Sequence, residues 1–290
     1  MDLDALMKEA EGGDDDALIA AIAASLVANY KRGRDSIVVS PFVVCVARAT
    51  DDFLMSAAIP SVAPIIPGEI DWLSALPTLD AVMGSTGRAL RLEVIEERFP
   101  GLAEALIAYG VPEVTAPAPV LAMTEPPEPT ASPGRTDGVE ISLIPAGDAQ
   151  AVDEYMAVGQ AAFEHWVTPD GLAFWRALVR RTIDTETGRA AIARQAGVPV
   201  GCGMVYGHHP AAELLGVGTV PAARRQGIAA ALCTALVDDH FARLPSVPLW
   251  LSAGDDGAHT LYEKLGFYRA ATQRNFGRQP PKAQGPIRPS

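Results

Sequence analysis

Residues 213–232, ELLGVGTVPAARRQGIAAAL, decide the fold, and we interpret them as a short strand, a tight loop and an alanine-rich helix. Gly216 and Gly218 lie inside the strand, where glycine weakens pairing and indicates a bulge or a ligand close to the backbone. Pro221 cannot donate to a sheet and marks the end of the strand. The helix begins beside two arginines, and its N-terminus offers unpaired N–H groups and a positive dipole end that suit a phosphate. The stretch therefore predicts a pyrophosphate site, with the rest of a nucleotide-bearing cofactor along the strand.

The composition bounds the kind of protein. The 290 residues suffice for two domains, and 49% of them are apolar, as in a globular protein. A net charge of −12 argues against non-specific nucleic-acid binding and agrees with a cationic substrate such as an amine. Three cysteines without metal-ligand spacing fit a reducing compartment, and the longest apolar run, residues 17–28, is too short to span a bilayer. We expect a cytoplasmic monomer or homodimer that binds neither nucleic acid nor a membrane.

The first half of the chain is predicted to mix helices and strands. Apolar spacing favours a helix over residues 14–33 and strands within residues 36–47. Prolines govern the next part, because proline lacks an N–H and interrupts regular structure. Their frequency predicts a loop over residues 56–70, and Pro77 predicts a break in a short helix over residues 70–83.

The rest of the first half leads into a proline-rich stretch. A strand over residues 90–94 and a helix over residues 100–109, stopped by Gly110, are followed by a strand over residues 114–123. Two prolines place that last strand near a sheet edge. Residues 124–137 hold four prolines and read as a linker, because such a stretch builds no core. The predicted division is 1–123, a degenerate or accessory α/β domain; 124–137, the linker; 138–277, the second domain; and 278–290, a disordered tail.

The second half alternates strands and helices more clearly. Its order, β-α-α-β-β-β-α-β-α-β, predicts a mixed sheet with helices on both faces, and hence an α/β fold. A turn at Gly197 joins two of the strands as a hairpin. The expected elements are strand 139–144, helices 148–163 and 168–183, strands 190–195, 198–206 and 213–220, helix 227–242, strand 249–252, helix 258–265 and strand 267–276.

Two motifs resemble those of the GNAT N-acyltransferase superfamily. The pattern Arg224-x-x-Gly227-x-Ala229 is similar to the loop with which that family binds the pyrophosphate of coenzyme A, and Pro221 precedes it as is common there. The run AHTLYEKLGF at residues 258–267 resembles the family's second motif, and the order of elements is the family's order. The resemblance covers roughly residues 139–277 and implies the GNAT fold.

The resemblance also implies a reaction and its residues. The amine of a small molecule would attack acetyl-CoA directly within a ternary complex. Glu213, eleven residues before the loop, would be the general base, and Tyr262 would protonate the departing thiolate. The amide of Val217 would polarise the thioester carbonyl. The pantetheine arm and the pyrophosphate would be held by Val217, Gly218, Thr219, Val220, Arg224, Arg225, Gln226, Gly227, Ile228 and Ala229. Asp255, where many members carry asparagine, is a departure that puts one cofactor hydrogen bond in doubt.

Each of these residues also has a structural interpretation. Tyr262 shares a helical face with leucines and could be core, and Glu213 could be a solvated carboxylate at the start of a strand. His208 and His209 are adjacent and are interpreted as turn residues. The segment 164–166 (Glu-His-Trp) lies in the region that resembles the family's acceptor wall, although the end of a helix explains it equally well. Cys202 and Cys233 are interpreted as packing residues.

The first half weakly echoes the second. Residues 90–111 repeat the strand, helix and glycine of residues 249–267, with Leu106 at the position of Tyr262 and no pyrophosphate loop. This favours a degenerate GNAT-like half that supports the other, the alternative being an unrelated α+β domain. Two other functions stay open, an acyl-CoA-binding regulatory protein with little catalysis and a protein acetyltransferase.

Overall fold

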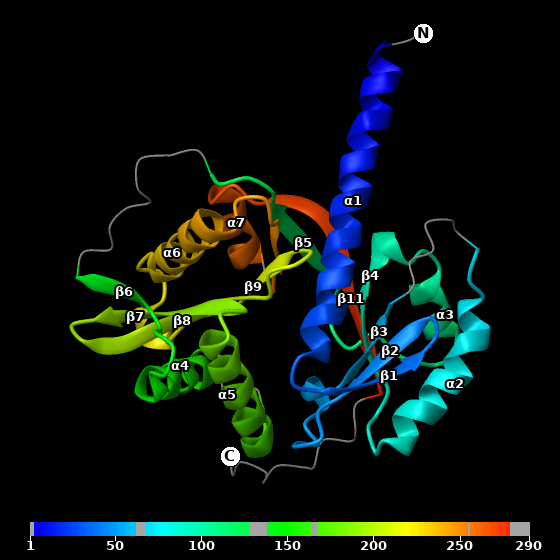
Figure 1. Cartoon of the computed structure of the whole chain (residues 1–290), viewed down its shortest axis with the longest axis horizontal. Helices are drawn as coiled ribbons and strands as arrows, with labels where there is room; N and C mark the ends of the chain where they lie inside the picture. Colours follow the sequence, from blue (N-terminus) through cyan, green and yellow to red (C-terminus); the bar gives the residue numbers. More distant parts are fainter. Residues whose placement is uncertain (1–2, 62–67, 128–137, 164–166, 255, 279–290) are drawn as a thin grey trace, which may run out of the picture.

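A single sheet joins the two halves of the chain. The computed structural model describes residues 3–61, 68–127, 138–163, 167–254 and 256–278. In this part of the chain the strands form one eleven-stranded sheet, in the order β1-β2-β3-β4-β11-β5-β10-β9-β8-β7-β6 (Figure 1). Helices lie on both faces of the sheet, so the predicted α/β class is confirmed.

The second half contains the elements that the sequence predicts, in the predicted order. Strands β6 to β9 are successive antiparallel neighbours, and β9 then pairs with β10 in parallel. Figure 1 shows α6 and α7 on one face of these strands and α4 and α5 on the other. The bounds are β6 Val139–Leu143, α4 Ala149–Ala162, α5 Pro169–Asp184, β7 Gly188–Gln195, β8 Val198–Tyr206, β9 Ala212–Thr219, η3 Pro221–Ala223, α6 Ile228–Arg243, β10 Leu249–Ser252, α7 Asp256–Lys264 and β11 Tyr268–Gly277.

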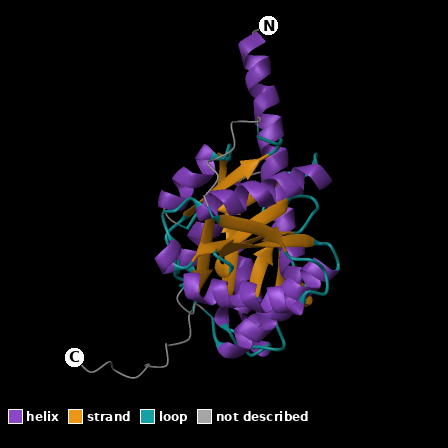
Figure 2. Ribbon diagram, turned by 90° about the vertical axis from the view of Figure 1, so that its left-hand side faces the viewer, coloured by secondary structure: helices purple, strands orange, loops and turns teal. Residues whose placement is uncertain are grey.

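The first half has its own run of strands and helices. Its N-terminal helix extends away from the body of the molecule (Figure 2), and no described helix is both long enough and apolar enough to cross a membrane. The bounds are α1 Leu3–Lys31, β1 Asp35–Val39, β2 Phe42–Val46, η1 Phe53–Met55, β3 Ala57–Pro60, α2 Trp72–Ser85, β4 Arg91–Ile95, η2 Glu96–Arg98, α3 Leu102–Ala108 and β5 Ala118–Met123.

Two predictions based on proline are wrong in this half. Within the predicted loop 56–70, residues 57–60 form β3, which pairs with β2 and is buried throughout. Pro77 lies inside α2 without ending it. The helix is held by the Asp71 cap and by a buried apolar face that includes Leu76 and Leu79, and this burial outweighs the loss of one backbone hydrogen bond.

The third correction concerns β5, which the sequence places near a sheet edge. This strand lies instead at the centre of the sheet, between β10 and β11, and both of these neighbours come from the second half. In return β11, the last strand of the second half, pairs with β4 of the first. The two halves therefore exchange a strand, an arrangement that no local sequence pattern encodes.

The exchanged strand β5 contributes to two cores at once. Its side chains alternate between the faces of the sheet, as in any strand. Val120 and Ala122 pack into the core beneath α1, α2 and α3, whereas Leu121 and Met123 pack into the core beneath α6. Halves joined in this way do not have separable cores. The domain boundaries stay a prediction, because residues 128–137 of the linker and residues 279–290 of the tail lie outside the described part of the chain.

Candidate active site

A bulge interrupts β9 at the glycine that the sequence singles out. Opposite β9, Cys202 pairs with Gly218 but Met204 pairs with Leu215, so β9 carries one extra residue here. Gly216 has a φ of +63°, a conformation that glycine adopts without strain. The bulge reverses the side-chain alternation. Leu215 packs on the side of α4 and α5, whereas Val217, only two residues later, packs on the side of α6.

Strands β9 and β10 separate beyond the bulge. They pair only at Ala212–Leu249 and Glu213–Trp250, and from there they diverge. A cleft of about 620 Å³ opens beside the diverging part of β9. Its lining gathers most of the predicted cofactor residues with the predicted acid, namely Val217, Gly218, Thr219, Arg224, Arg225, Gly227, Ile228, Ala229 and Tyr262.

The loop before α6 leaves the N-terminus of that helix open. Arg225 and Gly227 both have positive φ, of 63° and 78°, and no side chain caps the helix. The first N–H groups of a helix have no partner inside it. The cleft therefore has backbone donors and the positive end of a helix dipole on one wall, and this suits an anion.

Three predicted cofactor residues have side-chain or backbone groups that are already hydrogen-bonded within the protein. The Arg224 guanidinium donates to the carbonyls of Thr219 (3.3 Å) and Ala162 (3.0 Å), so it fixes the loop against the end of α4. The Gln226 side chain accepts a hydrogen bond from Gln195, on β7. The Val220 amide is already bonded to the carbonyl of Val200. Asp255, also predicted here, lies outside the described residues.

Tyr262 lies on α7 and faces the cleft. Its side chain is 8% exposed and packs edge-on against Phe267, with ring centroids 5.9 Å apart. The tyrosine is thus both a core residue and a lining residue, which unites the two interpretations that the sequence left open. Its apolar packing fixes the ring, and a fixed ring is what a proton donor in a cleft requires.

Glu213 faces a different cavity, on the other side of β9. Its carboxylate accepts a hydrogen bond from Asn29 of α1, at 3.0 Å. Burial, together with the nearby charge of Glu93, raises the pKa of Glu213 to about 8, although the Asn29 bond lowers it. A carboxyl with such a pKa can accept a proton near neutral pH, as a general base must.

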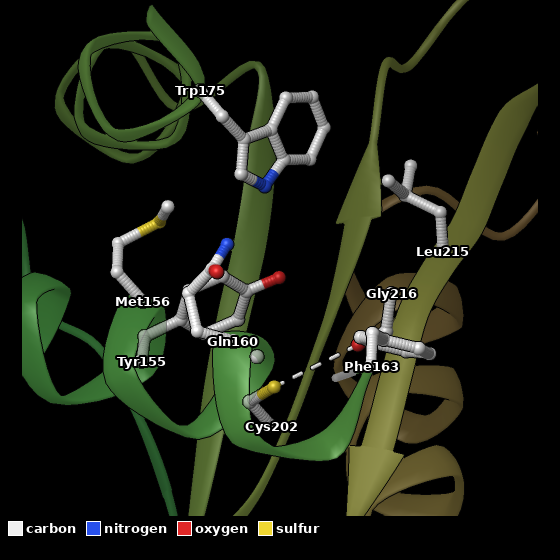
Figure 3. A pocket seen from close by; sticks show the side chains of 9 residues that line it. Tyr155, Met156, Gln160, Phe163, Trp175, Cys202, Leu215 and Gly216 are labelled. Carbon is white, nitrogen blue, oxygen red and sulfur yellow. Dashed lines mark hydrogen bonds between the residues drawn. The ribbon is translucent and has the colours of Figure 1, made fainter. Parts of the chain in front are cut away.

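Two cavities connect the Glu213 region with the bulge. The first, about 140 Å³, is lined by residues of α4, α5 and β9 that include Tyr155, Phe163 and Gly216 (Figure 3). The second, about 210 Å³, lies between the two halves and contains Glu213. Trp175 and Leu215 line both cavities, and Phe163 also lines the cofactor cleft. The three spaces are therefore adjacent in the order cleft, first cavity, second cavity.

The second cavity contains residues that sequence reasoning missed. The first half supplies most of its polar lining, including Asn29, Tyr30, Arg34, Arg91 and Glu93. These residues lie in α1, just after α1 and in β4. They form no sequence motif, so only the packing of the two halves brings them together. A charged pair inside a strand, Arg91 and Glu93, was the one available signal.

The remaining candidates have structural roles or cannot be placed. His208 and His209 lie in the turn between β8 and β9, as expected. Burial raises the pKa values of Cys202 and Cys233 to about 12, so neither thiol is a ready nucleophile. The Cys202 thiol donates to the Gly216 carbonyl at 3.7 Å and so supports the bulge (Figure 3). Residues 164–166 lie outside the described residues.

Comparison with known proteins gives a family match and several related structures. Residues 155–267 match the model of the Acetyltransferase (GNAT) family. A GCN5-related N-acetyltransferase from Kribbella flavida is 27% identical, with a TM-score of 0.70 over 90% of this chain and 96% of that chain. One from Sphaerobacter thermophilus is 16% identical, with a TM-score of 0.61 over 92% of each chain. A tandem GNAT protein from the clavulanic acid biosynthesis pathway is 17% identical, with a TM-score of 0.52 over 83% of this chain and 80% of that chain. No curated protein matches the sequence. The similarity in fold extends through the first half, as a tandem arrangement predicts.

Proposed function

We propose that the chain is an N-acetyltransferase of the GNAT superfamily, whose model matches residues 155–267, and that it transfers the acetyl group of acetyl-CoA directly to a small-molecule amine. The observation that carries the proposal is the cleft lined by β9, α6 and α7, which includes the uncapped N-terminus of α6. A cleft with open backbone donors at one end and the edge of β9 that faces away from β8 along one side fits a long cofactor with a pyrophosphate.

Different residues of the cleft would bind different parts of the cofactor. The amides of the loop and of the first turn of α6 would hold the pyrophosphate, and the strand from Val217 to Thr219 would hold the pantetheine arm. Bound acetyl-CoA supplies an activated acyl group. A bond forms between the acceptor nitrogen and the acetyl carbon, and the carbon–sulfur bond breaks.

The acetyl transfer also requires two proton transfers. The amine proton passes to Glu213, directly or through water, and the sulfur leaves with a proton from the Tyr262 hydroxyl. Glu213 of β9 and Tyr262 of α7 line different spaces on the two sides of β9, and Gly216 lines the first cavity, which lies between these spaces. A small molecule suits the acceptor site, because its two cavities are bounded by α1, α4 and α5.

Substitution of the two residues tests the assignment. We expect Tyr262→Phe to lower kcat roughly 100-fold and Glu213→Gln roughly 10-fold, as is usual for lost acid–base groups. The Glu213 variant should also lose the rise in kcat/KM that wild type shows as pH increases through about 8. Thiol release from acetyl-CoA over a panel of amines is the measurement, and Leu106→Met, at the matching position of the first half, is the control with unchanged rates.

Two outcomes would contradict the proposal. Unchanged transfer in both variants would remove the roles of these residues. Calorimetric binding of coenzyme A without turnover of any amine would instead favour a regulatory acyl-CoA-binding protein.

A further inference from the structure

The cavity between the two halves contains four ionisable side chains, and two of them form an ion pair with each other. The guanidinium of Arg91 forms an ion pair with Glu93, and it also donates a hydrogen bond to the Tyr30 hydroxyl at 2.8 Å. Both Glu93 oxygens are occupied, one by Tyr30 and Arg91 and the other by Gln273 at 3.1 Å. The Arg91–Glu93 pair is therefore internally satisfied and contributes no net charge to a ligand.

The other two ionisable side chains, Arg34 and Glu213, have only part of their hydrogen-bonding groups paired. Among the described residues, no carboxylate lies within ion-pair distance of Arg34, and its Nη2 has no hydrogen-bond partner. Only one oxygen of Glu213 accepts a hydrogen bond, that from Asn29. The cavity thus contains one guanidinium nitrogen and one carboxyl oxygen that can bind a ligand.

Hydrogen bonds and ring contacts fix the position of the Arg34 guanidinium. Its Nε donates to the Met55 carbonyl, and its Nη1 donates to the carbonyls of Tyr30 and Arg32, both at 3.4 Å. Its guanidinium lies over the rings of Tyr30 (4.8 Å) and Phe174 (5.0 Å). A guanidinium fixed by carbonyls and two rings loses little entropy when it binds a carboxylate.

The rest of the cavity is apolar. Leu26, Leu54, Met55, Leu178 and Leu215 line it together with Trp175. With volumes of about 140 and 210 Å³, the two acceptor cavities limit the occupant to a small molecule. An acceptor there needs an amine toward Glu213 and the bulge, a carboxylate toward Arg34, and an apolar side chain that packs against these apolar residues.

We infer that the acceptor is a small apolar amino acid, whose amine faces Glu213 and the Gly216 bulge and whose carboxylate pairs with Arg34 of the first half. The inference rests on the proposed function and extends it to the substrate class. It gives the first half a direct part in the active site, because Arg34 is a binding residue supplied from outside the family-matched segment.

Matched acceptors test this assignment. For each apolar amino acid the panel includes the amide and the decarboxylated amine, for example leucine, leucinamide and 3-methylbutylamine. With wild-type protein we expect kcat/KM at least 10-fold higher for the acid than for its two analogues. Arg34→Gln should raise KM for the acid at least 10-fold and abolish the preference, and Arg34→Lys should restore part of it.

The control is Arg48→Gln, which removes an exposed arginine of the same half whose ion pair with Asp35 lies outside the cavity; it should retain the preference. Coenzyme A binding by calorimetry shows that each variant is folded. Equal turnover of acids and amines by wild type, or a preference that survives in Arg34→Gln, would overturn the inference and leave the acetyltransferase intact. Absence of thiol release with every acceptor would contradict the proposed function itself.

Discussion

The two halves of the molecule build the same framework and use it differently. In the first half β3 and β4 run parallel with α2 between them in sequence, and in the second half β9 and β10 run parallel with α6 between them. The helix that follows, α3 or α7, leads in each half to a strand that crosses into the other half's part of the sheet. The difference lies at the N-termini of α2 and α6.

The N-terminus of α2 is closed by an acid. The Asp71 carboxylate accepts hydrogen bonds from the amide (3.1 Å) and the hydroxyl of Ser74, and these bonds hold the pKa of Asp71 below its usual value. A charged carboxylate at this point occupies a donor and repels a phosphate. The N-terminus of α6 has Gly227 and no side-chain cap. The same framework therefore has a helix N-terminus without a side-chain cap in the second half, where we propose anion binding, and a capped helix N-terminus in the first half.

The largest expected effect comes from the strand that the halves share. Leu121 of β5 is fully buried in the second half's core, although it belongs to the first half in sequence. Leu121→Ala should lower the free energy of unfolding by about 2–5 kcal/mol, because it leaves a cavity in a packed core. Denaturant unfolding followed by fluorescence and by circular dichroism should show one shifted transition.

The control for that experiment is Ile107→Ala, on the exposed face of α3, where the side chain is 55% exposed and the change should stay below about 0.5 kcal/mol. If Leu121→Ala instead produced two separate transitions, the halves would be independent folding units and the exchange of strands would not couple them.

The second effect tests the open helix N-terminus. Gly227→Asp places in α6 the kind of carboxylate that closes α2. We expect coenzyme A affinity to fall about 100-fold, or about 2.7 kcal/mol, measured by calorimetry. Gly101→Asp is matched in geometry, since Gly101 precedes α3 with a φ of +82° against +78° for Gly227, and it should leave affinity unchanged. Equal losses in the two variants would mean that backbone strain, and not the added charge, controls binding.

The smallest effect, taken per pH unit, concerns Glu213 and the stability of the interface between the halves. The pKa of Glu213 is about 8 in the folded protein against an ordinary 4.5, so the folded state binds more protons than the unfolded state between these values. The contribution of Glu213 to stability therefore falls as pH rises from about 5 to about 8. Glu213→Gln does not titrate, so its unfolding free energy should rise relative to that of wild type by about 1.4 kcal/mol for each pH unit across that range. A difference in unfolding free energy that does not vary with pH would show that the carboxyl has an ordinary pKa.

The sequence predicted the second half well because its signals are local. The Arg224–Gly227 loop, the Gly197 hairpin and the glycine bulge each depend on a few neighbouring residues, and the structure contains the loop, the hairpin and the bulge. The same reasoning failed for β5, since Pro117 and Pro119 indicate an edge. Only the pairing of Val120–Met123 with two strands from the other half shows that this segment is central.

The candidate site divides along the same line. The cofactor cleft follows from a contiguous motif, and the lining confirms that most of its predicted residues meet there. The proposed acceptor cavity contains Arg34 and Glu213, which lie far apart in the chain and line one cavity only because α1 packs beside β9. The periodicity and spacing of residues in the sequence do not predict which distant residues line the same cavity.

The exchanged strands also set an order for biosynthesis. A ribosome completes residues 118–123 before residues 249–252 and 268–277 exist, yet these later segments are the two neighbours of β5. The nascent first half therefore carries an apolar strand with both edges unpaired and β4 with one edge unpaired. Unpaired edges of this kind invite aggregation and are a reason for chaperone binding. The sheet closes only when the second half has been made, so a chain arranged as two successive halves matures as one.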